Sequence, residues 1–247
     1  MHMSNSVEWA QIFERYRHLS RDFQQKFQSI QGRLSIEKYE NSDSVIKKVR
    51  TELEELDEVF QDFNSWLYIS LLENLEEAKN NNAVGLLEIP SKIQRIKIKM
   101  KNKLQDKRIK VETDFDEKIA ISTYITFFEQ LINLIFQNAF KYSPSGSSIN
   151  ISTTNKSDYI LLEISSPGPV VENSEIHSLT TKGFRANAAI NSDIPGEGYG
   201  LYNCKRISDL LNINIDFKSQ STKRYTFNEI GYCNFTVTLK IPYEINS

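Results

Sequence analysis

The sequence predicts an α+β protein in which an antiparallel helical hairpin precedes an α/β domain. Two apolar stripes with steps of three and four residues fill the first third of the 247-residue chain, and strand-like alternation recurs in the rest. An asparagine-rich break, Lys79–Asn82, separates the two patterns. We therefore expect a helical domain over residues 1–83 and an α/β domain over residues 84–247.

The composition excludes several protein classes. Apolar residues make up 39% of the chain and charged residues 25%, as in ordinary globular proteins. No run approaches the roughly 20 apolar residues of a membrane span, so no transmembrane segment is expected. Two cysteines, Cys204 and Cys233, are too few for a disulfide or zinc framework, which favours a reducing, cytoplasmic location.

The hairpin prediction depends on two amphipathic segments, residues 12–34 and 45–71. The polar stretch 37–44 between them is turn-like, and Asp43 or Ser44 is a candidate N-cap for the second helix. A single hairpin of this length buries its apolar seam poorly, so we expect a homodimer in which two hairpins form a four-helix bundle. The stripes consist of Ile12, Tyr16, Leu19, Phe23, Phe27, Ile30 and Leu34, and of Ile46, Val49, Leu53, Leu56, Phe60, Phe63 and Leu67.

The second domain alternates helical and strand-like segments, which predicts helices packed on a sheet. The expected helices cover residues 91–105 and 123–141. The expected strands cover residues 109–114, 148–153, 159–165, 213–218 and 235–241.

A basic block interrupts this mildly acidic chain, whose net charge is −2. Residues 91–110 contain nine basic residues and one acidic residue. The bases recur at steps of two from Lys97 to Lys103, so on a helix they spread around it rather than forming one stripe. We interpret the block as a solvated helix face that pairs with the acidic hairpin; nucleic acid and anionic membranes are the alternatives.

Three segments of the second domain carry candidate functional residues. Helix 123–141 ends in Asn138-Ala-Phe-Lys-Tyr-Ser-Pro, and the predicted strand 159–165 leads into Ser165-Ser-Pro-Gly-Pro-Val. The third segment holds Lys182-Gly-Phe-Arg and, ten residues later, Gly196-Glu-Gly-Tyr-Gly-Leu.

The chemistry of these segments suits a phosphate ligand. Closely spaced glycines let backbone N–H groups approach an anion, and the helix that follows offers its positive N-terminus. Asn138 and Lys141 lie on one helical face, where an amide oxygen can ligate Mg²⁺ and an ammonium can meet a phosphate. Each motif alone is also compatible with a flexible loop or a solvated helix end.

Together, and in this order, the segments resemble the catalytic ATP-binding domain of the histidine kinases, one of the GHKL or Bergerat-type ATPases. The end of helix 123–141 is similar to the N box of that family, residues 182–185 to its F box, and residues 196–201 to its second glycine box. The resemblance spans residues 85–242. It implies a mixed sheet backed by helices and a lid, residues 186–195, that closes over ATP.

The resemblance also implies roles for single residues. Asn138 would bind the Mg²⁺ that bridges the ATP phosphates, Lys141 would contact phosphate oxygens, and Tyr142 would pack near the nucleotide. The other expected nucleotide-binding residues are Ser166 and Gly168 of the first glycine box, Lys182 and Arg185 at the border of the lid, and Gly196, Gly198, Gly200 and Leu201 of the second glycine box.

Three positions depart from the family pattern. Ser166 stands where the family has the Asp that accepts a hydrogen bond from adenine, and Val170 replaces the second glycine of that box. A hydroxyl in place of a carboxylate acceptor is expected to weaken binding by about 1–3 kcal/mol. Leu134 stands where the hydrolysing relatives have a Glu, and it cannot act as a general base.

The hairpin resembles the dimerisation and phosphoacceptor domain of the same family, with residues 20–30 in the phosphoacceptor register. Asp22 matches the acidic position of that motif, but Arg21 stands at the position of the phosphoacceptor His. His18, three residues earlier, is the alternative phosphoacceptor; otherwise it is a histidine on the bundle surface.

The sequence therefore predicts a dimeric, ATP- and Mg²⁺-binding signalling protein of the histidine kinase type whose phosphotransferase activity is impaired. It would act as a regulator, or pseudokinase, or as an atypical kinase upon a partner signalling protein, with no nucleic acid partner. The alternatives are a nucleotide-free dimeric scaffold or phosphotransfer-like interaction protein, and an active autokinase that uses His18.

Overall fold

A computed structural model describes residues 84–116, 119–192, 194–220 and 225–244, and in the N-terminal part residues 21, 23, 25–27, 29, 30, 49, 51–53 and 56. The chain divides into two compact units, Met1–Ser70 and Leu71–Ser247. The predicted domain ranges, 1–83 and 84–247, stay predictions.

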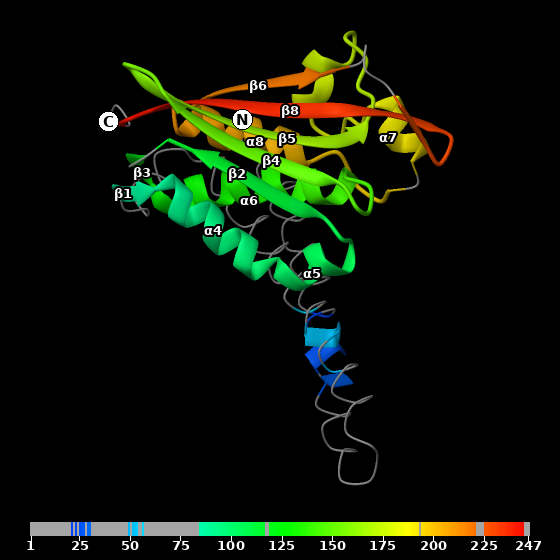
Figure 1. The fold of residues 1–247 in the computed structure, drawn as a ribbon. Helices are drawn as coiled ribbons and strands as arrows, with labels where there is room; N and C mark the ends of the chain where they lie inside the picture. Colours follow the sequence, from blue (N-terminus) through cyan, green and yellow to red (C-terminus); the bar gives the residue numbers. More distant parts are fainter. Residues whose placement is uncertain are drawn as a thin grey trace, which may run out of the picture. The chain divides into compact units, whose positions relative to one another are not determined.

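The second unit is built on a mixed six-stranded sheet (Figure 1). Strand β2 runs parallel to β4, and every other neighbouring pair is antiparallel. A small antiparallel sheet joins β1 (Val84–Glu88) to β3 (Ala120–Tyr124). In spatial order the large sheet contains β2 (Lys110–Phe115), β4 (Ser148–Asn155), β5 (Tyr159–Pro169), β8 (Ile230–Pro242) and β6 (Asn214–Ser219), with β7 (Tyr225–Phe227) paired to β8.

Two helices, α6 and α8, pack against each other and cover one face of this sheet (Figure 1). A short 3₁₀ helix, η1 (Ile176–Thr180), and α7 follow β5 in the chain. The α-helices of this unit are α4 (Ile89–Lys99), α5 (Lys101–Asp106), α6 (Ile125–Tyr142), α7 (Asn187–Asn191) and α8 (Gly200–Leu210).

The core lies between the sheet and α6. Helix α6 buries three phenylalanine side chains completely, Phe127, Phe128 and Phe136. Strand β5 alternates buried and half-buried positions, so that one face meets the helices and the other carries polar pairs. On that outer face the Thr236 hydroxyl donates to the Ser165 hydroxyl at 3.0 Å. Hydrophobic burial on one sheet face explains why the helices lie on that side.

The structure confirms the expected mixed sheet backed by helices, with the five predicted strands within a few residues of β2, β4, β5, β6 and β8. Two predictions of detail were wrong. The single helix predicted over residues 91–105 is interrupted at Met100, whose ψ is 7°, and forms α4 and α5. The helix predicted from residue 123 begins at Ile125, because residues 120–124 extend to pair with β1.

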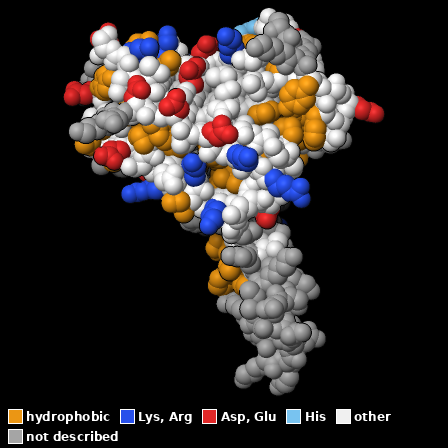
Figure 2. Space-filling view, viewed as in Figure 1, with side chains coloured by type: hydrophobic (Ala, Val, Ile, Leu, Met, Phe, Trp, Pro, Cys, Tyr) orange, Lys and Arg blue, Asp and Glu red, His pale blue; other side chains and the backbone are white. Residues whose placement is uncertain are grey.

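The basic block lies on α4 and α5 and just after them. Figure 2 shows Lys and Arg side chains over the part of the surface where Figure 1 places these helices, and Arg95, Lys99 and Lys101 are exposed, as a solvated face predicts. Lys92, by contrast, forms an ion pair with Glu129 of α6. This ion pair joins α4 to the central helix.

In the first unit, the described residues between 21 and 56 are helical. The Ser29 hydroxyl donates to a Glu52 carboxylate oxygen at 3.1 Å, which connects the two helical segments. Phe23 and Phe27 stack at 6.4 Å between ring centroids, and both are exposed, as is Leu53. Most of the predicted hairpin, including His18 and Asp22, lies outside the described residues.

No helix among the described residues is both long enough and apolar enough to cross a membrane.

Both cysteines are expected to be unreactive in the folded protein. Cys204 and Cys233 are free thiols with no exposed surface, and burial raises the pKa of the Cys204 thiol well above its usual value. Because the thiolate is the nucleophile, a disulfide reagent should react with both thiols at once in denaturant and only slowly without it. Rapid modification of either thiol in the native protein would contradict this packing.

Candidate functional site

Helix α6 presents Asn138, Lys141 and Tyr142 at its C-terminal end. Its apolar residues recur at helical spacing and are buried against the sheet, whereas these three side chains are half-buried. Leu134 lies one turn before Asn138 and is also half-buried. One turn before Asn138, the candidate magnesium ligand, the same helix face therefore carries the aliphatic side chain of Leu134 and not a carboxylate.

The end of α6 is tied to the end of β5. The Ser143 hydroxyl donates to the carbonyl oxygen of Ala139 at 2.7 Å, and it lies 3.3 Å from the carbonyl oxygen of Pro167. Pro144 follows, which has no N–H and cannot continue the helix. These contacts fix the exit of α6 beside the first glycine box.

Ser166 and Gly168 lie on the helix-facing side of β5. Ser166 is buried, with 6% of its surface exposed, and Gly168 is buried as well. A Cβ atom at Gly168 would lie 3.7 Å from the Cβ atom of Tyr142, so the two segments are in close contact. Beyond Gly168 the chain pairs with β8, where the Val170 N–H donates to the Gly231 carbonyl at 2.9 Å.

The glycine loop, residues 196–200, lies against residues 183–184. Gly198 has a φ of +77°, and a Cβ atom there would lie 2.5–2.7 Å from backbone atoms of Gly183 and Phe184. The Gly183 N–H donates to the Gly198 carbonyl at 3.3 Å. Only glycine fits this position, because both the backbone conformation and the space exclude a side chain.

The same loop also lies against the end of α6. A Cβ atom at Gly196 would lie 2.5 Å from Lys141 Nζ and 3.8 Å from the Tyr142 hydroxyl oxygen. Lys141 Nζ lies 5.4 Å from the centroid of the Tyr142 ring. The ammonium group of Lys141 is thus held between an aromatic ring and a glycine backbone.

Arg185 connects residues at both ends of the segment 186–195, which the resemblance predicts to be a lid. One of its terminal nitrogens donates to the carbonyl oxygens of Ala189 at 2.8 Å and Ile194 at 2.6 Å, and its Nε is buried with no hydrogen-bond partner. The Glu175 carboxylate accepts from the Asn187 N–H at 2.9 Å, at the start of α7. Lys182 is exposed.

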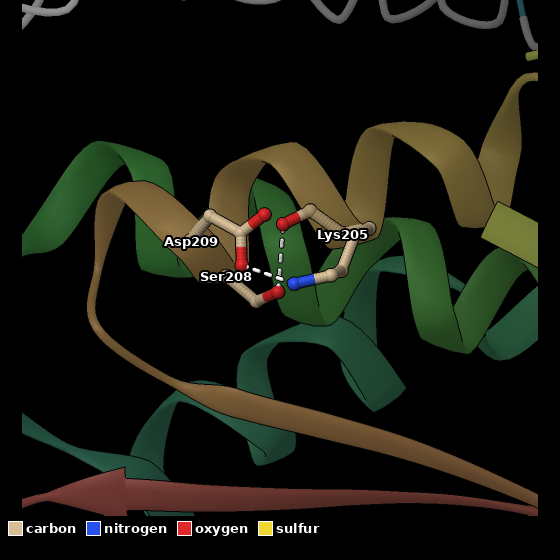
Figure 3. Close-up of polar contacts among 3 residues, drawn as sticks. All are labelled: Lys205, Ser208 and Asp209. Atoms are coloured by element: carbon tan, nitrogen blue, oxygen red, sulfur yellow. Dashed lines mark hydrogen bonds and ion pairs between the residues drawn. The ribbon is translucent and has the colours of Figure 1, made fainter. Parts of the chain in front are cut away.

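Helix α8 starts at Gly200, with Leu201 in its first turn and no side chain capping its first N–H groups. Those N–H groups are the donors that an anion would use. Figure 3 shows the polar contacts further along α8, where Lys205 forms an ion pair with Asp209 and the Ser208 hydroxyl donates to the Lys205 carbonyl at 2.8 Å. These contacts are local to the helix.

Known proteins resemble this chain in sequence. The family of histidine kinase-, DNA gyrase B-, and HSP90-like ATPases matches residues 123–244. The sensor histidine kinase GraS of Staphylococcus epidermidis is 28% identical over 123 residues, which are 50% of this chain and 35% of GraS. The sensor protein KdpD of Clostridium acetobutylicum is 28% identical over 201 residues, 77% of this chain and 21% of KdpD. Residues 123–244 therefore form an ATPase domain of the type shared by histidine kinases, DNA gyrase B and HSP90.

Solved structures of histidine kinases share the fold of this chain. The structure of the Acinetobacter baumannii histidine kinase AdeS matches with a TM-score of 0.55 and 18% identity, over 92% of this chain and 98% of that one. The catalytic domain of the histidine kinase ThkA matches with a TM-score of 0.54 and 15% identity, over 66% of this chain and 97% of that one. The chain spans about a third or less of the curated relatives described above.

The fold brings several of the expected site segments into contact. The end of α6 lies against both the end of β5 and the glycine loop, and the glycine loop lies against residues 183–184. His18 and Asp22 lie outside the described residues. Sequence reasoning did not single out Ser143, although a Ser-Pro pair directly after a helix is a signal for its end.

Proposed function

We propose that this chain is an ATP-binding signalling protein of the histidine kinase type, with Mg-ATP held between α6, the end of β5, the glycine loop and the start of α8. The observation that carries the proposal is the contact of the glycine loop with both Lys141 and residues 183–184. At Gly196 and Gly198 a side chain would collide with these neighbours, so only backbone atoms fit there. A phosphate group needs such side-chain-free backbone in order to approach N–H groups closely.

The residues present fit this ligand. The amide oxygen of Asn138 is the hard oxygen donor that Mg²⁺ prefers, and Lys141 supplies a positive charge beside the glycine loop. The N-terminus of α8, at Gly200 and Leu201, supplies backbone donors. Bound ATP would supply a transferable phosphoryl group. Leu134 offers no base to activate water, so the site suits retention or transfer of the phosphoryl group better than hydrolysis.

We further propose that the N-terminal segment forms a homodimer and that Arg21, at the phosphoacceptor position, makes the protein a regulator or an atypical kinase of a partner signalling protein. The exposed Phe23, Phe27 and Leu53 support dimerisation, because a second hairpin would cover apolar side chains that one chain leaves in water.

The test of this proposal is calorimetric titration of the full chain with ADP and a non-hydrolysable ATP analogue in the presence of Mg²⁺. We expect micromolar binding that Asn138→Ala weakens by about tenfold or more, because one ligand of the bridging Mg²⁺ is lost. Asn150→Ala is the control, since Asn150 is exposed on β4. No binding at millimolar nucleotide would sink the proposal and favour the dimeric scaffold instead.

Labelled ATP then separates a regulator from an autokinase. A regulator takes up no acid-labile label on its own hairpin. A label that appears in the wild type and is absent from His18→Ala would instead assign autophosphorylation to His18.

A further inference from the structure

Two carbonyl groups in the last turn of α6, those of Phe140 and Lys141, have no donor within the helix. A helix leaves its final carbonyl groups without intrahelical donors. The donor for the Phe140 carbonyl would be the N–H of residue 144, but residue 144 is proline and has none. Ser143 has an extended backbone, with a ψ of 132°, so the chain also leaves the helix before the Lys141 carbonyl could be paired within it.

Lys107 fills this deficit from another part of the fold. Its Nζ donates to the carbonyl oxygens of Phe140 at 2.8 Å and Lys141 at 3.0 Å. The same ammonium lies 4.9 Å from the centroid of the Phe140 ring. A positive charge at a helix C-terminus also interacts favourably with the helix dipole. One lysine thus replaces two missing backbone donors and adds a favourable charge.

The backbone of Lys107 is fixed as well. Lys107 caps α5, and its own N–H donates to the Lys103 carbonyl at 3.1 Å. Its carbonyl accepts from the Gly146 N–H at 3.0 Å, in the loop that leads from α6 to β4. Burial lowers the pKa of the Lys107 ammonium, whereas Lys101 in the same basic block is exposed. Lys107 therefore bridges α5 to both sides of the α6 exit.

The turn that Lys107 closes is the turn that carries the candidate ligand contacts. Lys107 bonds the main chain of Lys141, whose side chain lies against Gly196 of the glycine loop. Asn138 lies one turn earlier on the same helix, and Tyr142 follows directly. A shift of the last turn would move all three side chains relative to the glycine loop.

We propose that Lys107 is a positioning residue of the nucleotide site, which orders the last turn of α6 and so sets the placement of Asn138, Lys141 and Tyr142. This inference rests on the proposed function, because it concerns the geometry of that same site. Lys107 would thus order the interior of the fold, unlike the exposed lysines of the basic block.

The first arm of the test uses the 247-residue chain without nucleotide. Lys107→Met removes the donors and keeps a side chain of similar length, and Lys101→Met is the matched control from the exposed part of the block. We expect amide hydrogen exchange in residues 140–147 to become about tenfold faster in Lys107→Met and to stay unchanged in Lys101→Met. Unchanged exchange in Lys107→Met would overturn the proposal, whatever the nucleotide affinity.

The second arm measures the affinity for the Mg²⁺-bound ATP analogue in the same variants. We expect Lys107→Met to bind about tenfold more weakly, and Lys107→Arg, which retains donors and charge, to recover most of the affinity. Equal affinities of Lys107→Met and Lys101→Met would overturn the proposal.

If the wild type binds no nucleotide, the proposed function fails, and the exchange arm still decides whether Lys107 orders this turn. Should Lys107→Met not fold, Lys107→Arg still decides: faster exchange despite retained donors would overturn the assignment.

Discussion

The substitution Gly198→Ala is expected to weaken nucleotide binding by about 100-fold or more while most of the domain stays folded. Gly198 combines a φ of +77° with a space in which a Cβ atom would lie 2.5–2.7 Å from the backbone of Gly183 and Phe184. Backbone atoms cannot move aside as the end of a flexible side chain can. The loop must therefore move away from residues 183–184, which breaks the hydrogen bond from the Gly183 N–H to the Gly198 carbonyl.

The expected loss of affinity is about 100-fold or more, or about 2.7 kcal/mol, because the backbone donors of the whole loop are displaced together. Calorimetric titration with the Mg²⁺-bound ATP analogue measures it. Gly146→Ala is the matched control: its φ is +82°, but nothing lies within 4 Å of the added Cβ. That variant should lose about 1–2 kcal/mol of unfolding free energy through backbone strain alone and keep its affinity.

Two outcomes would contradict this account of the glycine loop. If Gly198→Ala binds nucleotide as well as Gly146→Ala does, the contact between residues 183–184 and the loop does not shape the site. If Gly198→Ala loses its cooperative thermal transition, the loop is a folding element of the domain and the assignment to ligand binding is wrong.

The parts of the fold that sequence reasoning predicted are those with long, regular patterns. Strands β4 and β5 alternate over many residues, and α6 carries an apolar face through five turns, so period and length identify them. Strands β1, β3 and β7 were not predicted. β7 has three residues, all of them exposed, and β1 buries only Leu87. Their pairing depends on partners far along the chain.

In the candidate site, too, the sequence predicted the residues of contiguous motifs and missed a residue whose partners lie far along the chain. Asn138, Lys141 and the glycines were singled out because their motifs are contiguous in sequence. Lys107 was not, because its partners are backbone carbonyl groups 33 and 34 residues away. The one local signal was Pro144, which removes the donor for the Phe140 carbonyl. A proline four residues after a helical carbonyl is therefore a reason to search for a cation from elsewhere.

The second large effect is expected at Ser166, where the substitution Ser166→Asp should strengthen the binding of adenine nucleotides. The family resemblance implies that a carboxylate at this position accepts a hydrogen bond from the adenine amino group. A charge-assisted hydrogen bond is stronger than one to a hydroxyl by about 1–3 kcal/mol, which corresponds to about 10-fold to 100-fold in affinity. Guanine nucleotides carry no amino group at that ring position and should gain nothing.

The same substitution should destabilise the protein without nucleotide, and this opposite effect makes the experiment decisive. Ser166 is 6% exposed, so an aspartate there is a buried, unpaired charge until a base supplies a donor. We expect a lower Tm in the nucleotide-free variant that added ADP restores. Ser165→Asp is the control, because Ser165 lies on the opposite face of β5 beside Thr236. Equal gains in both variants would indicate a general charge effect, and no gain in Ser166→Asp would show that adenine does not reach this strand.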